Sequence, residues 1–292
     1  MIDRFPEPAR AQLRAACEGG RTRPEWCFAE GRAHLAYWAP YQGADPVLVW
    51  QFDPGPDPEA AAALLRRSLQ EMGVAKTIHD ISLKPGLTPA ADRAVAHQAL
   101  IGAGFVMEVE RLLLAWAAGG DLPDDLPDDL PDDLPDDLPD DRGRLTYRPA
   151  RRMDPSEVID LLVRISEGSL DHDTRTEVAR VGAEHEARWV YDDLVNRKAE
   201  PDWFVIGYLG DSPVGLVAPD DRSIAYIGVV PEHRGHGYVD DLLARGTRTL
   251  AEAGVERVIA GTDVGNVPTA AAFLRAGYSE TGRLFRYYCR AP

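Results

Sequence analysis

The chain has 292 residues, 45% of them hydrophobic, which fits two ordinary globular domains with packed cores. Its 48 acidic residues outnumber its 32 basic residues, the formal net charge is −16 and the arginines are scattered, so we expect no direct binding of nucleic acid. Eleven aspartates between residues 121 and 141 supply most of that charge, so the acidity is largely one local feature.

The cysteines and the N-terminal segment bear on where in the cell the protein is expected. Cys17, Cys27 and Cys289 have neither metal-binding nor redox spacing, and an odd number of cysteines does not describe a disulfide-stapled secreted protein. Residues 1–8 lack the basic start and apolar core of an export signal, and no run approaches the roughly 20 apolar residues of a membrane span. We therefore expect a reducing cytoplasm and no membrane anchor.

An acidic repeat divides the chain. The tetrapeptide Leu-Pro-Asp-Asp occurs five times without interruption over residues 122–141. Each proline removes a backbone donor and disfavours helix in the residue before it, while the aspartates repel one another. We expect an extended linker over residues 119–143, between one domain at 1–118 and another at 144–292. A strip that binds cations or a partner is the functional alternative.

The second half predicts an alternation of short strands and helices. In chain order these are a strand over 145–149, a helix from the Asp154-Pro155 cap to about 167, a helix from the Thr174-x-x-Glu177 pattern towards 194, strands over 203–208, 214–218 and 224–230, a helix over 240–253, a strand over 255–260, a helix over 268–275 and a strand over 284–289. Turn residues separate the three middle strands, which indicates an antiparallel meander. The order predicts an α/β (α+β) fold with a mixed sheet.

The segment between the third meander strand and the next helix suits a phosphate. It reads Val-Val-Pro-Glu-His-Arg-Gly-His-Gly-Tyr over residues 229–238. Gly235 and Gly237 have no Cβ to hold a ligand away, and the first turn of the following helix offers unpaired N–H groups at a positive dipole end. This pattern predicts a site for an anionic, phosphate-bearing cofactor.

The order of elements and this loop resemble the GNAT superfamily of acyl-CoA-dependent N-acetyltransferases over about residues 145–292. The family motif is Arg or Gln, two residues, Gly, one residue, then Gly or Ala, and residues 234–239 here read Arg-Gly-His-Gly-Tyr-Val. A companion motif, an Asn before a short helix and a Gly-aromatic pair, matches residues 266–278. The resemblance implies the GNAT fold, a mixed central sheet flanked by helices.

The resemblance also implies acetyl-CoA as co-substrate and direct attack by the primary amine of a small molecule, with no covalent enzyme intermediate and no metal. The backbone N–H near Val229 would face the thioester oxygen, and the pyrophosphate would lie on the N–H groups of residues 234–239. The expected cofactor contacts are Val229, Val230, Arg234, Gly235, His236, Gly237, Tyr238, Val239, Asn266 and Phe273.

The chain departs from the motif at the start of the helix. Val239 replaces the usual Gly or Ala, which adds a branched side chain beside the cofactor without forbidding helical angles. Asp240 and Asp241 follow at once. Carboxylates suit a free helix N-terminus but oppose a pyrophosphate placed there, so aspartates that face the ligand would weaken its binding.

Two catalytic positions of the family also differ. Ser223 lies about where several relatives carry a carboxylate that acts as the general base. Phe273 lies where many relatives carry a tyrosine that acts as the general acid. A thiol with a pKa of roughly 8.5 is a tolerable leaving group, so loss of the acid need not stop the reaction. A water relay to Asp220 or Asp221, Glu184 or His185, or an amine that arrives neutral could each replace the missing base.

An acidic surround of the cleft would favour a cationic acceptor, such as an amino sugar, a polyamine or an aminoglycoside. His172, Glu184 and His185 are the candidates for an acceptor pocket, although a turn or capping role for His172 is the simpler interpretation. His233 and His236 are three residues apart but imply no third ligand, so we expect no metal. The sequence gives no indication of the oligomeric state.

The first half contains a faint echo of the second. Residues 69–78 parallel residues 250–259, and residues 103–105 parallel 276–278, which indicates a degenerate GNAT-like copy in a tandem pair; chance similarity is the alternative. The same register places Asp-Pro-Gly-Pro-Asp, residues 53–57, where the phosphate loop would lie. Prolines lack N–H donors and aspartates repel phosphate, so this copy is expected not to bind the cofactor.

The rival hypothesis is a non-catalytic module that binds CoA or another ligand and docks a partner. Its support is the serine and the phenylalanine at the two catalytic positions and the aspartates at the helix start. Release of thiol from acetyl-CoA with any amine separates the two hypotheses.

Overall fold

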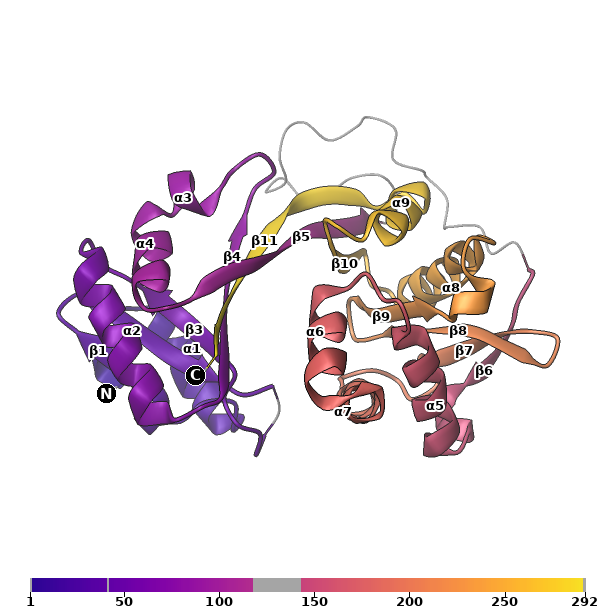
Figure 1. The fold of residues 1–292 in the computed structure, drawn as a ribbon, viewed down its shortest axis with the longest axis horizontal. Helices are drawn as coiled ribbons and strands as arrows, with labels where there is room; N and C mark the ends of the chain where they lie inside the picture. The colour runs from indigo at the N-terminus through magenta and orange to yellow at the C-terminus, as the bar shows by residue number, and fades with distance from the viewer. Residues whose placement is uncertain (1, 41, 118–142, 291–292) are drawn as a thin grey trace. The chain divides into compact units, whose positions relative to one another are not determined.

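The computed structural model describes residues 2–40, 42–117 and 143–290 (Figure 1). The predicted linker, apart from Gly143, lies outside the described residues. Contacts divide the chain into one unit of Met1–Glu110 with Arg283–Pro292 and another of Arg111–Gly282. These units differ from the predicted domains in two segments, because residues 111–117 belong to the second unit and residues 283–290 to the first. The division into domains 1–118 and 144–292 stays a prediction.

The first unit contains four helices and a mixed sheet among its described residues. Its elements are α1 (Ala9–Glu18), β1 (Cys27–Glu30), β2 (Ala33–Trp38), β3 (Leu48–Asp53), α2 (Pro58–Met72), β4 (Lys76–Leu83), α3 (Pro89–Asp92), α4 (Ala94–Gly102), the start of β5 (Val106–Ala117) and the end of β11 (Ser279–Arg290). β1, β2 and β3 pair antiparallel, β3 meets β4 in parallel at Leu48 and Ile78, and β4 pairs antiparallel with the end of β11.

The second unit contains the rest of β5 and β11 and the segment between them. Its further elements are β6 (Thr146–Pro149), α5 (Pro155–Ser166), α6 (His172–Val181), α7 (Ala183–Val195), β7 (Val205–Leu209), β8 (Ser212–Pro219), β9 (Ile224–Val229), α8 (Tyr238–Glu252), β10 (Arg257–Asp263) and α9 (Val267–Arg275). β6 to β9 form a four-stranded antiparallel sheet in chain order, and β10 pairs antiparallel with β5. The predicted meander is confirmed, and so is the mixed sheet flanked by helices, since β3 and β4 pair in parallel.

The predicted helix from Thr174 towards residue 194 is wrong, because two helices occupy this segment. Asp171 is the N-cap of α6, and its Oδ1 accepts the Thr174 N–H at 2.9 Å, so the cap lies three residues earlier than predicted. Gly182, with φ 88° and ψ 155°, ends α6 and starts α7. Glycine alone adopts this backbone conformation readily, so this residue breaks the helix.

Both faces of the second unit's sheet are covered. Neighbouring residues of one strand point to opposite faces, and Leu216 and Val217 of β8 accordingly belong to different cores. Val217 packs with Leu242 and Leu243 of α8, whereas Leu216 packs with Leu162 and other apolar residues of α5. The sheet is therefore held rigidly between helices, with β9 at its edge.

The repeat expected from the sequence is visible in the order of elements. Apart from the short α3 between β4 and α4, the succession β3, α2, β4, α4, β5 in the first half matches β9, α8, β10, α9, β11 in the second (Figure 1). Gly73 and Gly254, which the sequence pairs, follow α2 and α8 with φ of 60° and 85°. At the start of α2, Asp57 accepts the N–H groups of Glu59 and Ala60 at 2.9 and 3.2 Å. The first turn of α2 thus has its own acceptors.

His79 in β4 is buried, with Nδ1 2.9 Å from the Val49 carbonyl oxygen. Burial lowers the pKa of His79, although the Val49 carbonyl and the Asp80 carboxylate oppose this shift. The unfolded chain takes up a proton near pH 6.5, so the stability that His79 contributes is complete above that pH and is lost as the pH falls below it. An NMR titration should give an imidazole midpoint below 6.5; a midpoint at or above 6.5 would contradict this.

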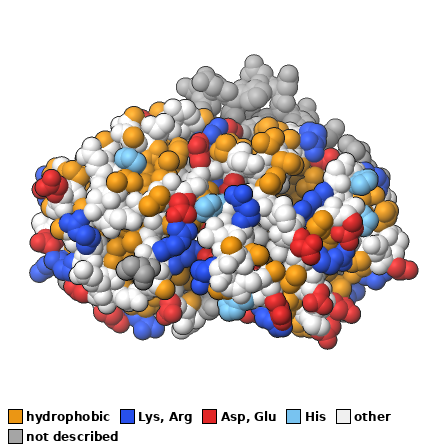
Figure 2. All heavy atoms as spheres, viewed as in Figure 1, with side chains coloured by type: hydrophobic (Ala, Val, Ile, Leu, Met, Phe, Trp, Pro, Cys, Tyr) orange, Lys and Arg blue, Asp and Glu red, His pale blue; other side chains and the backbone are white. Residues whose placement is uncertain are grey.

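The surface carries mixed charge on the face drawn in Figure 2, where Asp and Glu side chains are interspersed with Lys and Arg and no continuous basic area is visible. None of the helices in the described part of the chain is both long and apolar enough to span a bilayer.

Candidate functional site

The parallel strands β9 and β10 touch at one point and then separate. A bridge joins Ser223 to Ile259, whose N–H donates to the Arg222 carbonyl oxygen at 3.0 Å. Beyond this bridge, residues 224–229 form no backbone hydrogen bond with β10 in the described part of the chain. A cavity of about 570 Å³ lies beside β9, and all of β9 and part of β10 line it.

The free edge of β9 presents backbone donors to this cavity. Val230 N–H donates to the Val214 carbonyl oxygen at 2.9 Å, and Val229 is the partner of Gly215. Residue pairs in an antiparallel ladder alternate between bonded and non-bonded, so the Val229 N–H points away from β8 and towards the open edge. Val229 also lines the cavity. Its N–H can therefore meet a ligand that lies between the strands.

The glycine loop, residues 234–239, leads from β9 into α8. Gly235 and Gly237 have φ of 79° and 76°, which residues with a side chain rarely adopt. Apart from the two residues next to it in the chain, no heavy atom would lie within 4 Å of a Cβ placed on Gly235. Among the described residues, the N–H groups of residues 235–239 donate to no acceptor. Gly235, Gly237, Tyr238 and Val239 line the cavity. A row of unsatisfied donors thus lies at its wall, at the N-terminus of α8.

The Arg234 side chain braces this loop from the protein side. Its guanidinium donates to three carbonyl oxygens, those of Val229 at 3.0 Å, Glu167 at 2.7 Å and Ile165 at 2.8 Å. Its backbone N–H donates to the Pro231 carbonyl oxygen at 3.2 Å. Arg234 therefore joins the end of β9 to the end of α5.

Arg144 holds the other side of the loop. Its guanidinium donates to the carbonyl oxygens of His236 and Gly237 at 2.9 and 2.8 Å, and it forms an ion pair with the fully buried Asp241 carboxylate. The C=O and N–H of one trans peptide plane point in opposite directions. Because Arg144 holds the carbonyls of His236 and Gly237, the N–H groups of Gly237 and Tyr238 point away from the Arg144 side chain. Both residues line the cavity.

The two aspartates at the start of α8 are neutralised. Asp240 pairs with Arg275 of α9 at 2.7 Å, and Asp241 pairs with Arg144. Neither aspartate lines the cavity beside β9. The repulsion between these carboxylates and a pyrophosphate, which the sequence raised, is thus offset by local cations.

The far end of the same cavity is acidic. Asp171 at the start of α6, Glu186 of α7 and Tyr226 of β9 line it together. Burial raises the pKa of Tyr226, the carboxylates of Asp171 and Glu186 raise it further, and Arg234 opposes them. The phenol therefore stays protonated at neutral pH and can donate a hydrogen bond between two carboxylates.

Arg111 of β5 organises this acidic end. Its Nε lies 2.6 Å from the Asp263 carboxylate, and its Nη2 lies 2.8 Å from Asp173 and 3.5 Å from Asp171. The other oxygen of Asp263 accepts the His172 N–H at 2.7 Å. The start of α6 is thereby fixed to the end of β10, so the acidic end is preorganised.

Most residues expected at the cofactor lie together. Those that line the cavity are Val229, Arg234, Gly235, Gly237, Tyr238, Val239, Asn266 and Phe273. Val230 and His236 do not line it: Val230 is fully buried, and His236 Nδ1 lies 2.9 Å from the Arg234 carbonyl oxygen. Phe273 is buried in the core against Tyr278.

The catalytic and acceptor candidates do not gather there. Ser223, Asp221, His172, Glu184 and His185 are all absent from the cavity wall. Ser223 lies at the junction of β9 and β10, and the Asp221 carboxylate pairs with Lys198 at 3.0 Å. Glu184 and His185 are exposed on α7.

Among the residues at the site that the sequence did not reveal are Arg144, Asp171, Glu186 and Trp189. A signal for Glu186 existed, because Glu186, Val190 and Asp193 recur at helical spacing and share the cavity face of α7. No local pattern marks Arg144, which lies 93 residues before Gly237.

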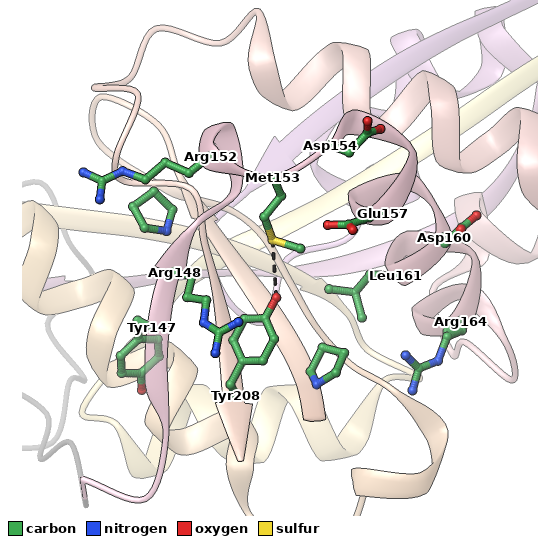
Figure 3. Close-up of a pocket in the computed structure, with 12 residues that line it drawn as sticks. Tyr147, Arg148, Arg152, Met153, Asp154, Glu157, Asp160, Leu161, Arg164 and Tyr208 are labelled. Atoms are coloured by element: carbon green, nitrogen blue, oxygen red, sulfur yellow. Dashed lines mark hydrogen bonds between the residues drawn. The ribbon is translucent and has the colours of Figure 1, made fainter. Parts of the chain in front are cut away.

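A second cavity, of about 750 Å³, lies between β6, α5 and β7 (Figure 3). Its Tyr208 hydroxyl donates to Met153 Sδ at 3.3 Å, and the Arg148 guanidinium lies 4.2 Å from the centre of the Tyr208 ring. These groups engage one another, and no residue of the glycine loop lines this cavity. We therefore assign function to the smaller cavity beside β9. Among the described residues, no group of three or more metal-binding side chains is arranged to hold an ion.

Comparison with known proteins identifies the type of domain. The family described as "Acetyltransferase (GNAT) family" matches residues 166–278, which include the glycine loop and Asn266. A comparison with curated proteins gave no match.

Solved structures are similar along most of the chain. They include a GCN5-related N-acetyltransferase from Sphaerobacter thermophilus (14% identity, 97% of this chain and 85% of that one, TM-score 0.56), a tandem GNAT protein from the clavulanic acid biosynthesis pathway (15%, 98% and 89%, 0.55) and a conserved protein of unknown function from Staphylococcus epidermidis (14%, 90% and 93%, 0.53). At these sequence identities, the similarity supports the fold and nothing about activity. The GNAT fold and its tandem arrangement, both expected from the sequence, are confirmed.

Proposed function

Since residues 166–278 match the GNAT acetyltransferase family, we propose that the protein transfers an acetyl group from acetyl-CoA to the primary amine of a small molecule. The family and the fold support acyl transfer in general. The observation that carries the finer proposal is the run of N–H groups at residues 235–239 that have no acceptor among the described residues.

The glycine loop has the chemistry that a diphosphate requires. Consecutive N–H donors at a helix N-terminus bind anionic oxygens, and the helix dipole adds to the attraction. Gly235 and Gly237 allow close approach because no Cβ stands in front of their amides. The remaining contacts would come from Val229, Tyr238 and Asn266, which line the same cavity.

Acetyl-CoA, when bound, supplies an activated thioester. The acceptor nitrogen bonds to the carbonyl carbon, the carbon–sulfur bond breaks, the sulfur leaves as a thiolate and the nitrogen loses its proton to water. Val229 N–H, directed to the open edge of β9, would donate to the carbonyl oxygen as negative charge grows on it. The cavity beside β9 would hold both substrates, so proximity would supply much of the rate. The sequence of bond changes needs neither a covalent enzyme intermediate nor a metal.

We place the reaction in the cytoplasm, for which the three unpaired cysteines, Cys17, Cys27 and Cys289, are the support.

Calorimetry on the full chain tests the donor first. We expect acetyl-CoA at millimolar concentration to bind with one site per chain, and the absence of binding would end the proposal. Release of thiol with a panel of primary amines then tests transfer. Binding without thiol release for any amine would favour the non-catalytic module, for which the buried Phe273 at the usual acid position is the specific support.

A further inference from the structure

Resting on the proposed function, we propose that the Tyr226 hydroxyl binds the acceptor nitrogen and orients it towards the thioester carbon. An N–H of the amine would donate to Tyr226 Oη, which leaves the lone pair of the nitrogen free to attack. This role complements that of the Val229 N–H, which would stabilise the oxygen of the same thioester.

The hydroxyl of Tyr226 has no hydrogen-bond partner among the described residues, and it is not one of their enclosed side-chain atoms that lack a partner. Since Tyr226 lines the cavity beside β9, its hydroxyl opens into that cavity. The ring, by contrast, packs with the apolar residues between the sheet and α5. Buried polar groups in native proteins are nearly always hydrogen-bonded, so one that meets only a cavity is available to a ligand.

The ring of Tyr226 leans along β9 towards Val229. A Cβ placed on Gly228 would lie 3.4 Å from Tyr226 Cε1, the ring carbon next to the one that carries the hydroxyl. Gly228 immediately precedes Val229, whose N–H points to the open edge of the strand. The hydroxyl end of the ring is thus directed towards the residue that would hold the thioester oxygen.

Tyr226 also lies on the face of the sheet that the cofactor would leave free. It packs with residues of α5, whereas its neighbour Ile227 packs on the other side with residues of α8. The diphosphate is proposed to bind at the N-terminus of α8, and the pantetheine arm along the edge of β9. The cavity walls on the Tyr226 face, which include Leu170 and Trp189, are therefore left for a second substrate.

The tyrosine would hold the amine without taking its proton. Burial raises the pKa of Tyr226, and the carboxylates of Asp171 and Glu186 raise it further, so the phenol is neutral at neutral pH. A neutral hydroxyl oxygen accepts a hydrogen bond from an N–H. The nitrogen then bonds to the carbonyl carbon, the carbon–sulfur bond breaks, and the proton of the nitrogen goes to water as in the proposed function.

Tyr226→Phe tests the inference because it keeps the ring and removes only the hydroxyl. The probe is whichever of 2-phenylethylamine, glucosamine and spermidine gives the fastest thiol release with the wild type. At saturating acetyl-CoA, we expect kcat/KM for this amine to fall about tenfold, as for one lost hydrogen bond. Calorimetry should give an unchanged affinity for acetyl-CoA. The midpoint of thermal unfolding should be unchanged or higher, because the lost hydroxyl has no partner in the folded protein.

Tyr208→Phe is the matched control. Tyr208 belongs to the same sheet, but its hydroxyl donates to Met153 Sδ in the second cavity, so amine kinetics and acetyl-CoA affinity should both stay at wild-type values. A wild-type kcat/KM for the amine in Tyr226→Phe would overturn the inference, and so would an equal loss of acetyl-CoA affinity, which would place the hydroxyl at the cofactor. Absence of thiol release from the wild type with all three amines would instead remove the proposed function, on which the inference rests.

Discussion

Replacing Gly237 by glutamate is expected to weaken acetyl-CoA binding at least 100-fold, which corresponds to about 2.7 kcal/mol. A Cβ on Gly237 would lie 3.6 Å from both Arg144 Nη2 and Asp240 Oδ2, so the glutamate would compete with the loop carbonyls for Arg144 and would add a negative charge at the start of α8, next to the proposed diphosphate site. A residue other than glycine at φ 76° also strains the backbone by about 1–3 kcal/mol. Calorimetry with acetyl-CoA measures the loss.

Gly254→Glu is the matched control at the other end of α8. Gly254 has a comparable φ of 85° and open space around its Cβ position, but it lies outside the cavity. The same strain and charge should therefore lower stability to a similar extent without changing the affinity for acetyl-CoA. Equal affinities in Gly237→Glu and the wild type would show that the cofactor does not use this loop.

Removal of the Arg144 side chain is expected to weaken acetyl-CoA binding about tenfold and to destabilise the second unit. The guanidinium holds the carbonyls of His236 and Gly237, so its loss frees the peptide planes that direct the donors into the cavity. It also leaves the fully buried Asp241 carboxylate without its cation, which costs about 3–5 kcal/mol. Calorimetry and thermal unfolding of Arg144→Met measure the two effects.

A double variant separates positioning from stability. Arg144→Met with Asp241→Asn removes both members of the buried ion pair and should recover most of the thermal stability lost in the single variant. The carbonyl bonds remain absent, so acetyl-CoA affinity should stay about tenfold low. Wild-type affinity in the stable double variant would show that Arg144 does not position the loop.

Much of the fold could be read from the sequence because its signals are local. The alternation of short β-rich runs with turn residues identified β7, β8 and β9, and the Asp154-Pro155 pair marked the start of α5, where Asp154 does accept the Ser156 N–H at 2.8 Å.

The break at Gly182 was missed because one glycine within a helical pattern does not reveal its φ. The exchange of strand segments was also missed: residues 111–117 pair with β10, and the end of β11 pairs with β4. Such pairings join distant segments.

The residues of the site likewise fall into those that local sequence patterns mark and those that only tertiary packing brings together. The glycine loop was predictable because two glycines at fixed spacing before a helix have a direct consequence for backbone donors. The rest of the cavity was not, because Asp171, Glu186 and Trp189 come from the ends and faces of helices that tertiary packing brings together. Arg144 reaches the loop from 93 residues away, so its role follows from contacts alone.

A crystal structure of the full chain with CoA would show where the diphosphate binds. We expect diphosphate oxygens within hydrogen-bonding distance of the amide nitrogens of Gly235, Gly237 and Val239, with the pantetheine arm along the open edge of β9. A diphosphate bound elsewhere, for instance in the cavity of Figure 3, while these amides face only solvent, would contradict it.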